Sequence, residues 1–258
     1  MLSHSIHSEL VKVTSRHSTV TIIVGLTIFA PLMTIALISI ALNLITNDLS
    51  ALVTAMQNPN EIKLLIFQSS NLFCLLLSSL VVTTEYGTSV IYRTYQVFRK
   101  RLTALFGKLI VIESIVLATS IIAFSITVFI LNFSGIEMFH IDHPLILILF
   151  SAVNCFIIAL FSYGISLILS RTIPVLVTTI GIFYILPGAL STVFAFLSPS
   201  SASDILYLPI NAASSPVQAV LQGTSYSGVH PIAGVTLTLA LSLLLVVIGC
   251  IIQLRRDI

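Results

Sequence analysis

Long apolar runs separated by short polar segments limit what this chain can fold into more than any other feature of the sequence. Of its 258 residues, 57% are hydrophobic and only 8% are charged. A soluble domain carries about 25% charged residues, so this composition could not cover a surface exposed to water. A helix needs about 20 apolar residues to cross the hydrocarbon core of a bilayer. The sequence therefore predicts an all-α integral membrane protein.

Six apolar runs have the length of a membrane-spanning helix. We expect spans at about 20–42, 64–84, 105–131, 144–169, 173–197 and 231–253. Because these spans use nearly all of the chain, residues 1–258 are interpreted as a single transmembrane domain. The first run is too long for the apolar part of a cleavable signal peptide, so we expect it to remain as an anchor. Residues 198–230, rich in Ser, Pro and Gly, are predicted to form short re-entrant or interfacial helices at the outer surface.

Basic residues are distributed unevenly around these spans. With six spans and both termini in the cytoplasm, the inner segments hold Lys12, Arg16, Arg93, Arg99, Lys100, Arg101, Lys108, Arg171, Arg255 and Arg256. The outer loops hold one cation, Lys63, with Asp48, Glu61, Glu137, Asp142 and Asp204. Segments rich in Lys and Arg stay on the cytoplasmic side of a membrane. The ratio of ten basic residues to one therefore favours this topology over five or seven spans.

The segment 84–109 between the second and third spans carries five of the eleven basic residues. Apolar residues recur there at spacings of 4, 3 and 4, which is one face of a helix: Ile91, Tyr95, Phe98 and Leu102. Basic residues occupy the other face. We interpret the segment as an amphipathic helix at the inner membrane surface that a cytoplasmic partner can hold.

The N-terminal residues 1–18 show a similar two-faced pattern. Ile6, Leu10 and Val13 share one helical face, and Glu9, Lys12 and Arg16 share another. This pattern predicts a short amphipathic helix lying in the membrane interface before the first span.

The order of motifs around the basic segment resembles the ABC transporter type-2 permease family. Glu85-Tyr86-Gly87-Thr88 precedes the basic helix, and Gly107-Lys108 opens the third span. The N-terminal run from Ser8 to Lys12 and the fifth apolar run, interrupted by Pro and Gly, are also similar to that family. The likeness covers essentially the whole chain. One departure is that the proline common near the end of the basic segment is absent.

The resemblance implies the membrane subunit of an ATP-driven exporter in a bacterial cytoplasmic membrane. Such a subunit would pair with a second permease chain, as a homodimer or a close heterodimer, and bind two separately encoded ATPase subunits. Those subunits would hold ATP and Mg, and this chain would hold no cofactor. Family members contact the ATPase through the inner coupling helix, which corresponds here to Glu85, Tyr86, Gly87, Thr88, Arg93, Tyr95 and Arg99. The exported compound would be amphipathic: a drug, an antibiotic, a peptide or a lipid-like molecule.

Polar residues at helical spacing inside the spans indicate where such a compound could pass. Polar groups in hydrocarbon turn toward protein or water rather than lipid. The candidates for a substrate path are Gln68, Asn71 and Ser78 in the second span and Thr178 and Tyr184 in the fifth. Glu113 in the third span is an intramembrane charge, which either lines a path or sits in the inner interface beside a basic side chain.

Catalytic and metal-binding patterns are missing from the sequence. Gly107-Lys108 lacks the remainder of a phosphate-binding loop, and neither a zinc-protease motif nor a nucleophile elbow occurs. His140, Asp142 and His143 are interpreted as solvated loop residues rather than metal ligands. We therefore expect neither an enzyme nor a nucleic-acid partner, but membrane lipid around the chain. Two alternatives to the exporter remain open: a secondary transporter, and a membrane scaffold or immunity protein that transports nothing.

Overall fold

The protein is described by a computed structural model in which residues 2–46, 59–87, 101–135, 139–187, 189–190, 209–223 and 230–255 can be described. Within these residues all regular structure is helical, which confirms the predicted all-α class. Five helices are long and apolar enough to cross a membrane: 17–40, 60–86, 101–133, 144–169 and 231–255. By length and composition they fit a multi-pass membrane protein.

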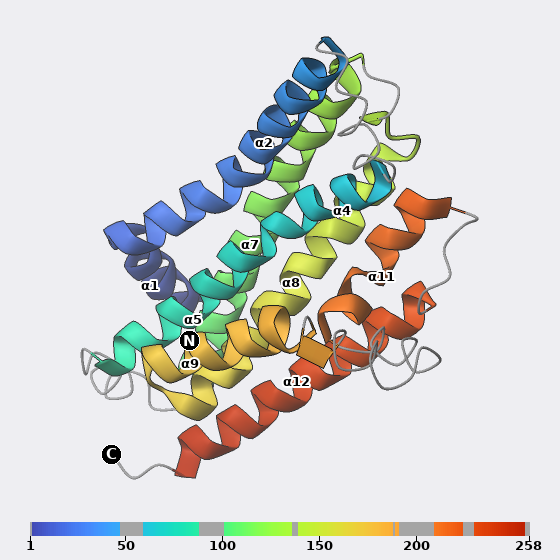
Figure 1. Cartoon of the computed structure of the whole chain (residues 1–258). Coiled ribbons are helices and arrows are strands. Elements are labelled where there is room, and N and C mark those ends of the chain that lie inside the picture. The colour runs from blue at the N-terminus through green and yellow to red at the C-terminus, as the bar shows by residue number, and fades with distance from the viewer. Residues whose placement is uncertain are drawn as a thin grey trace.

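The helices form one bundle (Figure 1). In chain order they are α1 (Leu2–Ser15), α2 (His17–Thr46), α4 (Pro59–Ser69), α5 (Asn71–Gly87), α7 (Arg101–Phe133), α8 (Pro144–Leu169), α9 (Thr172–Ile180), the π-helix η3 (Gly181–Ile185), α11 (Pro209–Gln222) and α12 (Pro231–Arg255). Figure 1 shows α8 in the middle of the bundle, with α2 and α12 on opposite outer sides.

Helix α8 is the centre of the bundle because it packs against α5, α7, α9, α11 and α12. Its closest neighbour is α12, and glycines make the approach possible. A Cβ added at Gly164 would lie 2.8 Å from Leu245 Cβ, and one added at Gly249 would lie 2.6 Å from Leu167 Cβ. Without a hydrophobic driving force inside a membrane, helices associate through such close contacts.

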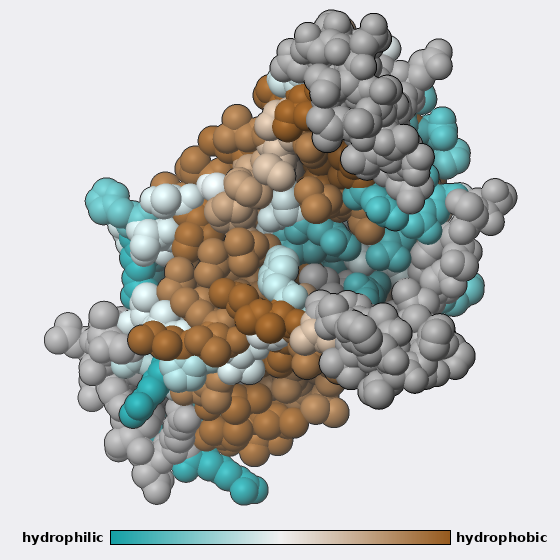
Figure 2. Space-filling view, in the orientation of Figure 1, coloured by the Kyte–Doolittle hydropathy of each residue, from teal (hydrophilic) through white to brown (hydrophobic). Residues whose placement is uncertain are grey.

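The outward faces of the long helices are apolar. Figure 2 shows hydrophobic side chains over much of the coloured surface in this view. On the outermost helices, Leu32 of α2 is 56% exposed and Val247 of α12 is 57% exposed. Such a surface is suited to contact with lipid rather than water.

The observed helices refine the expected spans. The fourth span, 144–169, agrees with α8, and the first, third and sixth are slightly longer than expected. The second, 60–86, is made of two helices in line, because the single turn residue Ser70 separates α4 from α5. In the fifth, expected at 173–197, α9 begins one residue earlier at Thr172 and is followed by η3, but residues 191–208 lie outside the described part of the chain. The count of six spans and the side on which each terminus lies stay predictions.

Helix α11 falls in the segment where short helices were predicted before the last span. It packs against α4, α8 and α12. Contact with α12 is close, since a Cβ added at Gly234 would lie 2.4 Å from the Ala212 carbonyl oxygen. Its depth in the membrane stays a prediction.

Candidate functional site

Five charged side chains meet at one end of the bundle. Glu9 and Lys12 come from α1, Arg16 from the position between α1 and α2, Glu85 from the end of α5, and Lys108 from the early part of α7. We refer to these five residues as the charge cluster. It joins segments that are far apart in the sequence, because α1 packs directly against α7.

Lys108 connects the two carboxylates of the charge cluster. Its ammonium group donates a hydrogen bond to Glu85 Oε2 and lies 3.7 Å from Glu9 Oε2. Two N-terminal cations, Lys12 of α1 and Arg16 directly after it, complete the pairing. Lys12 Nζ donates to Glu9 Oε1 at 2.6 Å and lies 3.8 Å from Glu85 Oε1. Arg16 Nη2 lies 3.9 Å from Glu85 Oε1, so each carboxylate is shared between cations on different helices.

Burial makes this pairing obligatory. The side chains of Glu9, Glu85 and Lys108 are 0%, 1% and 3% exposed, whereas those of Lys12 and Arg16 are 28% and 27% exposed. An isolated charge buried in protein is strongly destabilising, but a paired one is tolerated. The three deep charges therefore need each other, and α1, α5 and α7 are held together where they meet.

Hydroxyl groups extend the charge cluster to neighbouring chain segments. Arg16 Nη1 donates to Thr84 Oγ1 at 2.6 Å, directly before Glu85. One residue earlier, Thr83 Oγ1 accepts a hydrogen bond from Thr172 Oγ1 at 3.1 Å, at the start of α9. The end of α5 is thus fixed by α1, α7 and α9 together.

The charge cluster also explains how α1 is oriented. The sequence predicted an apolar face of Ile6, Leu10 and Val13, but Leu10 is 44% exposed while Glu9 is fully buried beside Val13. Pairing of Glu9 with Lys12 and Lys108 decides which face turns inward. A periodicity argument treats a glutamate as a surface residue, and it failed here because the partner lies on another helix.

The structure covers part of the predicted coupling segment. Glu85 belongs to the charge cluster, Tyr86 is half-buried, and Gly87 ends α5. Thr88, Arg93, Tyr95 and Arg99 lie outside the described residues. The pairs of Glu85 with Lys108 and of Glu9 with Lys108 were not predicted, although both motifs that contain them had been singled out.

The predicted path residues lie in different surroundings. Asn71 is 1% exposed and accepts a hydrogen bond from Asn154 of α8, and Ser78 donates to the Ala159 carbonyl oxygen at 2.8 Å. Both therefore face α8 of the same chain. Gln68 and Thr178 are half-buried, and Tyr184 is 40% exposed. Their role in transport stays a prediction.

Glu113 lies in α7 and does not join the charge cluster. It is 6% exposed, and neither carboxylate oxygen has a hydrogen-bond partner among the residues that the structure describes. Five residues separate it from Lys108, a turn of about 140° around a helix. The two side chains therefore leave α7 in different directions, and the expected pairing of Glu113 with a basic side chain is not seen within the described residues.

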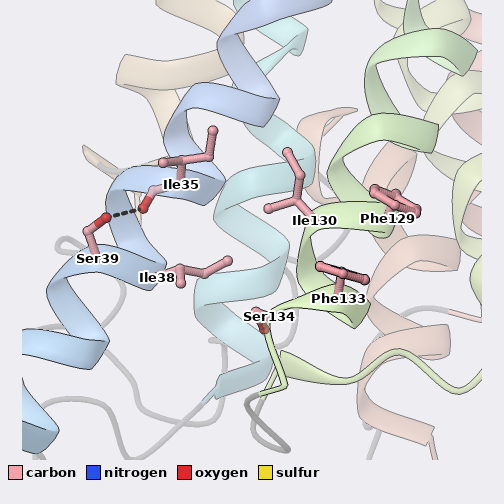
Figure 3. Close-up of a pocket in the computed structure, with 7 residues that line it drawn as sticks. All are labelled: Ile35, Ile38, Ser39, Phe129, Ile130, Phe133 and Ser134. Carbon is pink, nitrogen blue, oxygen red and sulfur yellow. Dashed lines mark hydrogen bonds between the residues drawn. The ribbon is translucent and has the colours of Figure 1, made fainter.

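An apolar groove lies between α2 and α7, away from the charge cluster (Figure 3). Its volume is about 250 Å³, and its lining is Ile35, Ile38, Ser39, Phe129, Ile130, Phe133 and Ser134. The two hydroxyl groups donate to carbonyl oxygens of their own chain segments, at 2.8 Å for Ser39 and 2.7 Å for Ser134. None of the predicted path residues lines this groove.

Comparison with known proteins assigns no family to this arrangement. No protein-family model matches the chain, and no curated protein matches it either.

Proposed function

We propose that this chain is the membrane-spanning permease subunit of an ATP-driven ABC exporter. The charge cluster is the observation that carries the proposal. It ties the last turn of α5 to the early part of α7 through Glu85 and Lys108, on either side of the segment 88–100. The motifs that resemble the type-2 permease family contain these two residues, together with Glu9 and Lys12 of α1.

In this proposal a cytoplasmic ATPase subunit holds the segment between α5 and α7. Because Lys108 bonds to Glu85 and pairs with Glu9, α5, α7 and α1 respond together when the segment is displaced. Packed helices with two discrete arrangements can transmit such a displacement across a membrane protein. The partner ATPase subunits supply ATP and Mg, and a second permease chain completes the path for an amphipathic compound.

The topology belongs to the same proposal. Six spans with both termini in the cytoplasm place the charge cluster on the cytoplasmic side, where basic segments remain. Residues 88–100 then face the ATPase, and α11 lies toward the outer side. A bacterial cytoplasmic membrane would be the location.

Association with an ATPase tests the proposal directly. The tagged chain is purified from the membranes of the cells that make it and probed for a bound ABC ATPase. The expected result is a complex with ATPase activity that rises when an exported compound is added. Two test variants, Gly87→Leu and Glu85→Ala, alter the end of α5. In each, the complex with the ATPase should weaken, or its ATPase activity should no longer rise with the exported compound. A chain that purifies without ATPase under conditions that preserve other ABC complexes contradicts the proposal.

A secondary transporter is the second candidate, and Glu113 is the observation that favours it. A buried carboxylate in a membrane span is a candidate for proton or ion coupling. The two proposals differ in energy source. In inverted membrane vesicles, export appears as uptake of the compound into the vesicle. Uptake that stops with an ATPase inhibitor supports the exporter. Uptake that stops only when the proton gradient is collapsed supports the secondary transporter.

A further inference from the structure

A second group of polar side chains lies in the middle of the bundle, between the junction of α4 with α5 and helix α8. Its members are Ser70, Asn71, Ser151 and Asn154, none of which is more than 2% exposed. Asn154 Nδ2 donates to Asn71 Oδ1 at 3.4 Å, and the same oxygen accepts the thiol of Cys155 at 3.5 Å. Asn71 and Asn154 are near the middle of two candidate spans, 60–86 and 144–169.

Several donors and acceptors in this group have no hydrogen-bond partner among the residues that the structure describes. Among the described residues, no partner is found for Asn71 Nδ2, Asn154 Oδ1, Ser70 Oγ or Ser151 Oγ. An amide carries two N–H donors and an oxygen that accepts two hydrogen bonds, and a hydroxyl both donates and accepts. Buried polar groups in proteins are almost always paired. Four unpaired groups on two segments that the Asn154–Asn71 hydrogen bond joins therefore require a ligand.

The regular helix changes at the same place. Helix α4 ends at Ser69 and α5 begins at Asn71, so Ser70 is a turn residue between two helices within one candidate span. The Ser70 carbonyl oxygen still accepts from the Cys74 N–H at 3.1 Å, so the turn is confined to this residue. Inside a membrane such an interruption is tolerated where protein or water satisfies the backbone groups at the turn, and interrupted helices often mark polar binding sites.

We propose that Ser70, Asn71, Ser151 and Asn154 form an internal water-binding site between α4–α5 and α8. The chemistry of the free groups suits water. The four side chains are neutral and together offer both donors and acceptors, as a water molecule does. A buried water makes two to four hydrogen bonds to such groups. The site does not depend on the proposed transport function.

The native thiol of Cys155 reports on this site, since it bonds to the same oxygen of Asn71 as Asn154 does. In the background Cys74→Ala with Cys250→Ala, Cys155 is the single thiol of the chain. The purified, folded protein is transferred into D2O, and the loss of the S–H infrared band is followed over time. Water bound beside the thiol makes the band exchange rapidly, and Asn154→Leu should slow the exchange about tenfold, as expected when one hydrogen bond to the water is lost.

Controls separate local hydration from opening of the whole bundle. A chain that keeps Cys250 as its single thiol should exchange at the same rate with and without Asn154→Leu, because Cys250 lies away from Asn154. Cys250 is about one helical turn before Gln253 of α12, and Gln253 bonds to the Leu167 carbonyl oxygen near the C-terminal end of α8. Ser151→Val provides a second variant if Asn154→Leu does not fold, as judged by circular dichroism and gel filtration. Equal exchange rates of the Cys155 S–H band in the background protein and in Asn154→Leu, whether both slow or both fast, overturn the proposal.

Discussion

The charge cluster and the water-binding site are both buried and polar, but their buried groups are paired in different ways. In the charge cluster, two carboxylates and the Lys108 ammonium compensate each other across three helices. In the water-binding site, the side chains are neutral and leave donors and acceptors unused by described neighbours. Charge makes the first region intolerant of losing a deeply buried partner. In the second region a neutral group that loses one hydrogen-bond partner can bond to another. The comparison therefore predicts that substitutions in the two regions lower the unfolding free energy by different amounts.

The largest effect is expected for Lys108→Ala. This substitution leaves Glu9 and Glu85 buried without the cation that lies between them. Breaking a buried pair by removing one partner costs about 3–5 kcal/mol of unfolding free energy. Unfolding of the purified protein in detergent measures the loss.

A matched double variant tests the reason for that loss. Glu85→Gln with Lys108→Met removes one charge of each sign and leaves Glu9 paired with Lys12. Replacing a buried ion pair by uncharged residues is often neutral. The double variant should therefore be more stable than Lys108→Ala, and equal instability of the two would mean that packing rather than charge holds these helices.

An intermediate effect is expected for Asn154→Leu. It removes the partner of Asn71 but leaves no buried charge, so the cost should be about 1–3 kcal/mol. Adding Asn71→Leu should restore part of the stability, because replacing both partners by apolar groups removes the unpaired group. Thermal unfolding of Asn154→Leu, Asn71→Leu and the double variant beside the unchanged protein provides the comparison. A double variant that loses the sum of both single losses contradicts the pairing.

The smallest effect is expected for Lys12→Ala. Lys12 belongs to the charge cluster, but its side chain is 28% exposed and water can solvate its position. Partly exposed pairs contribute about 0–1 kcal/mol, and salt screens them. The loss should shrink further when unfolding is measured at high ionic strength. A loss as large as that of Lys108→Ala would show that depth does not decide the importance of these charges.

Apolar length predicted the helices well, because long hydrophobic runs are the strongest signal that a sequence carries. The fourth span coincides with α8, and α12 begins at the expected Pro231. The interruption at Ser70 was not predicted. It falls in the polar run Gln68–Asn71, but apolar residues resume on both sides of that run, so the window still has the hydropathy of a span. The average hydropathy of a run of about 20 residues indicates whether the run can be buried. It does not detect one turn residue inside the run.

The candidate site was harder to predict than the fold. Glu85 was singled out from a local motif, but its pairing with Lys108 and the burial of Glu9 depend on contacts between helices distant in the sequence. Asn71 and Ser78 share a helical face as expected, and that face turns toward α8. Periodicity identifies residues that share a face, but the surface that the face meets is decided by packing.

Export by the complex that carries Glu85→Gln with Lys108→Met tests the central claim most directly, because this variant removes the link between α5 and α7 and leaves the buried Glu9 paired with Lys12. Arg16 loses Glu85, but its side chain is 27% exposed and water can solvate it. ATP-driven export and ATP hydrolysis are measured on the same membrane vesicles, after the folded chain has been quantified. Our account predicts that hydrolysis persists while export falls about tenfold or more, within the range of measured coupling free energies. Export at the rate of the unchanged complex would contradict the claim that the charge cluster transmits movement from the segment 88–100 to the bundle.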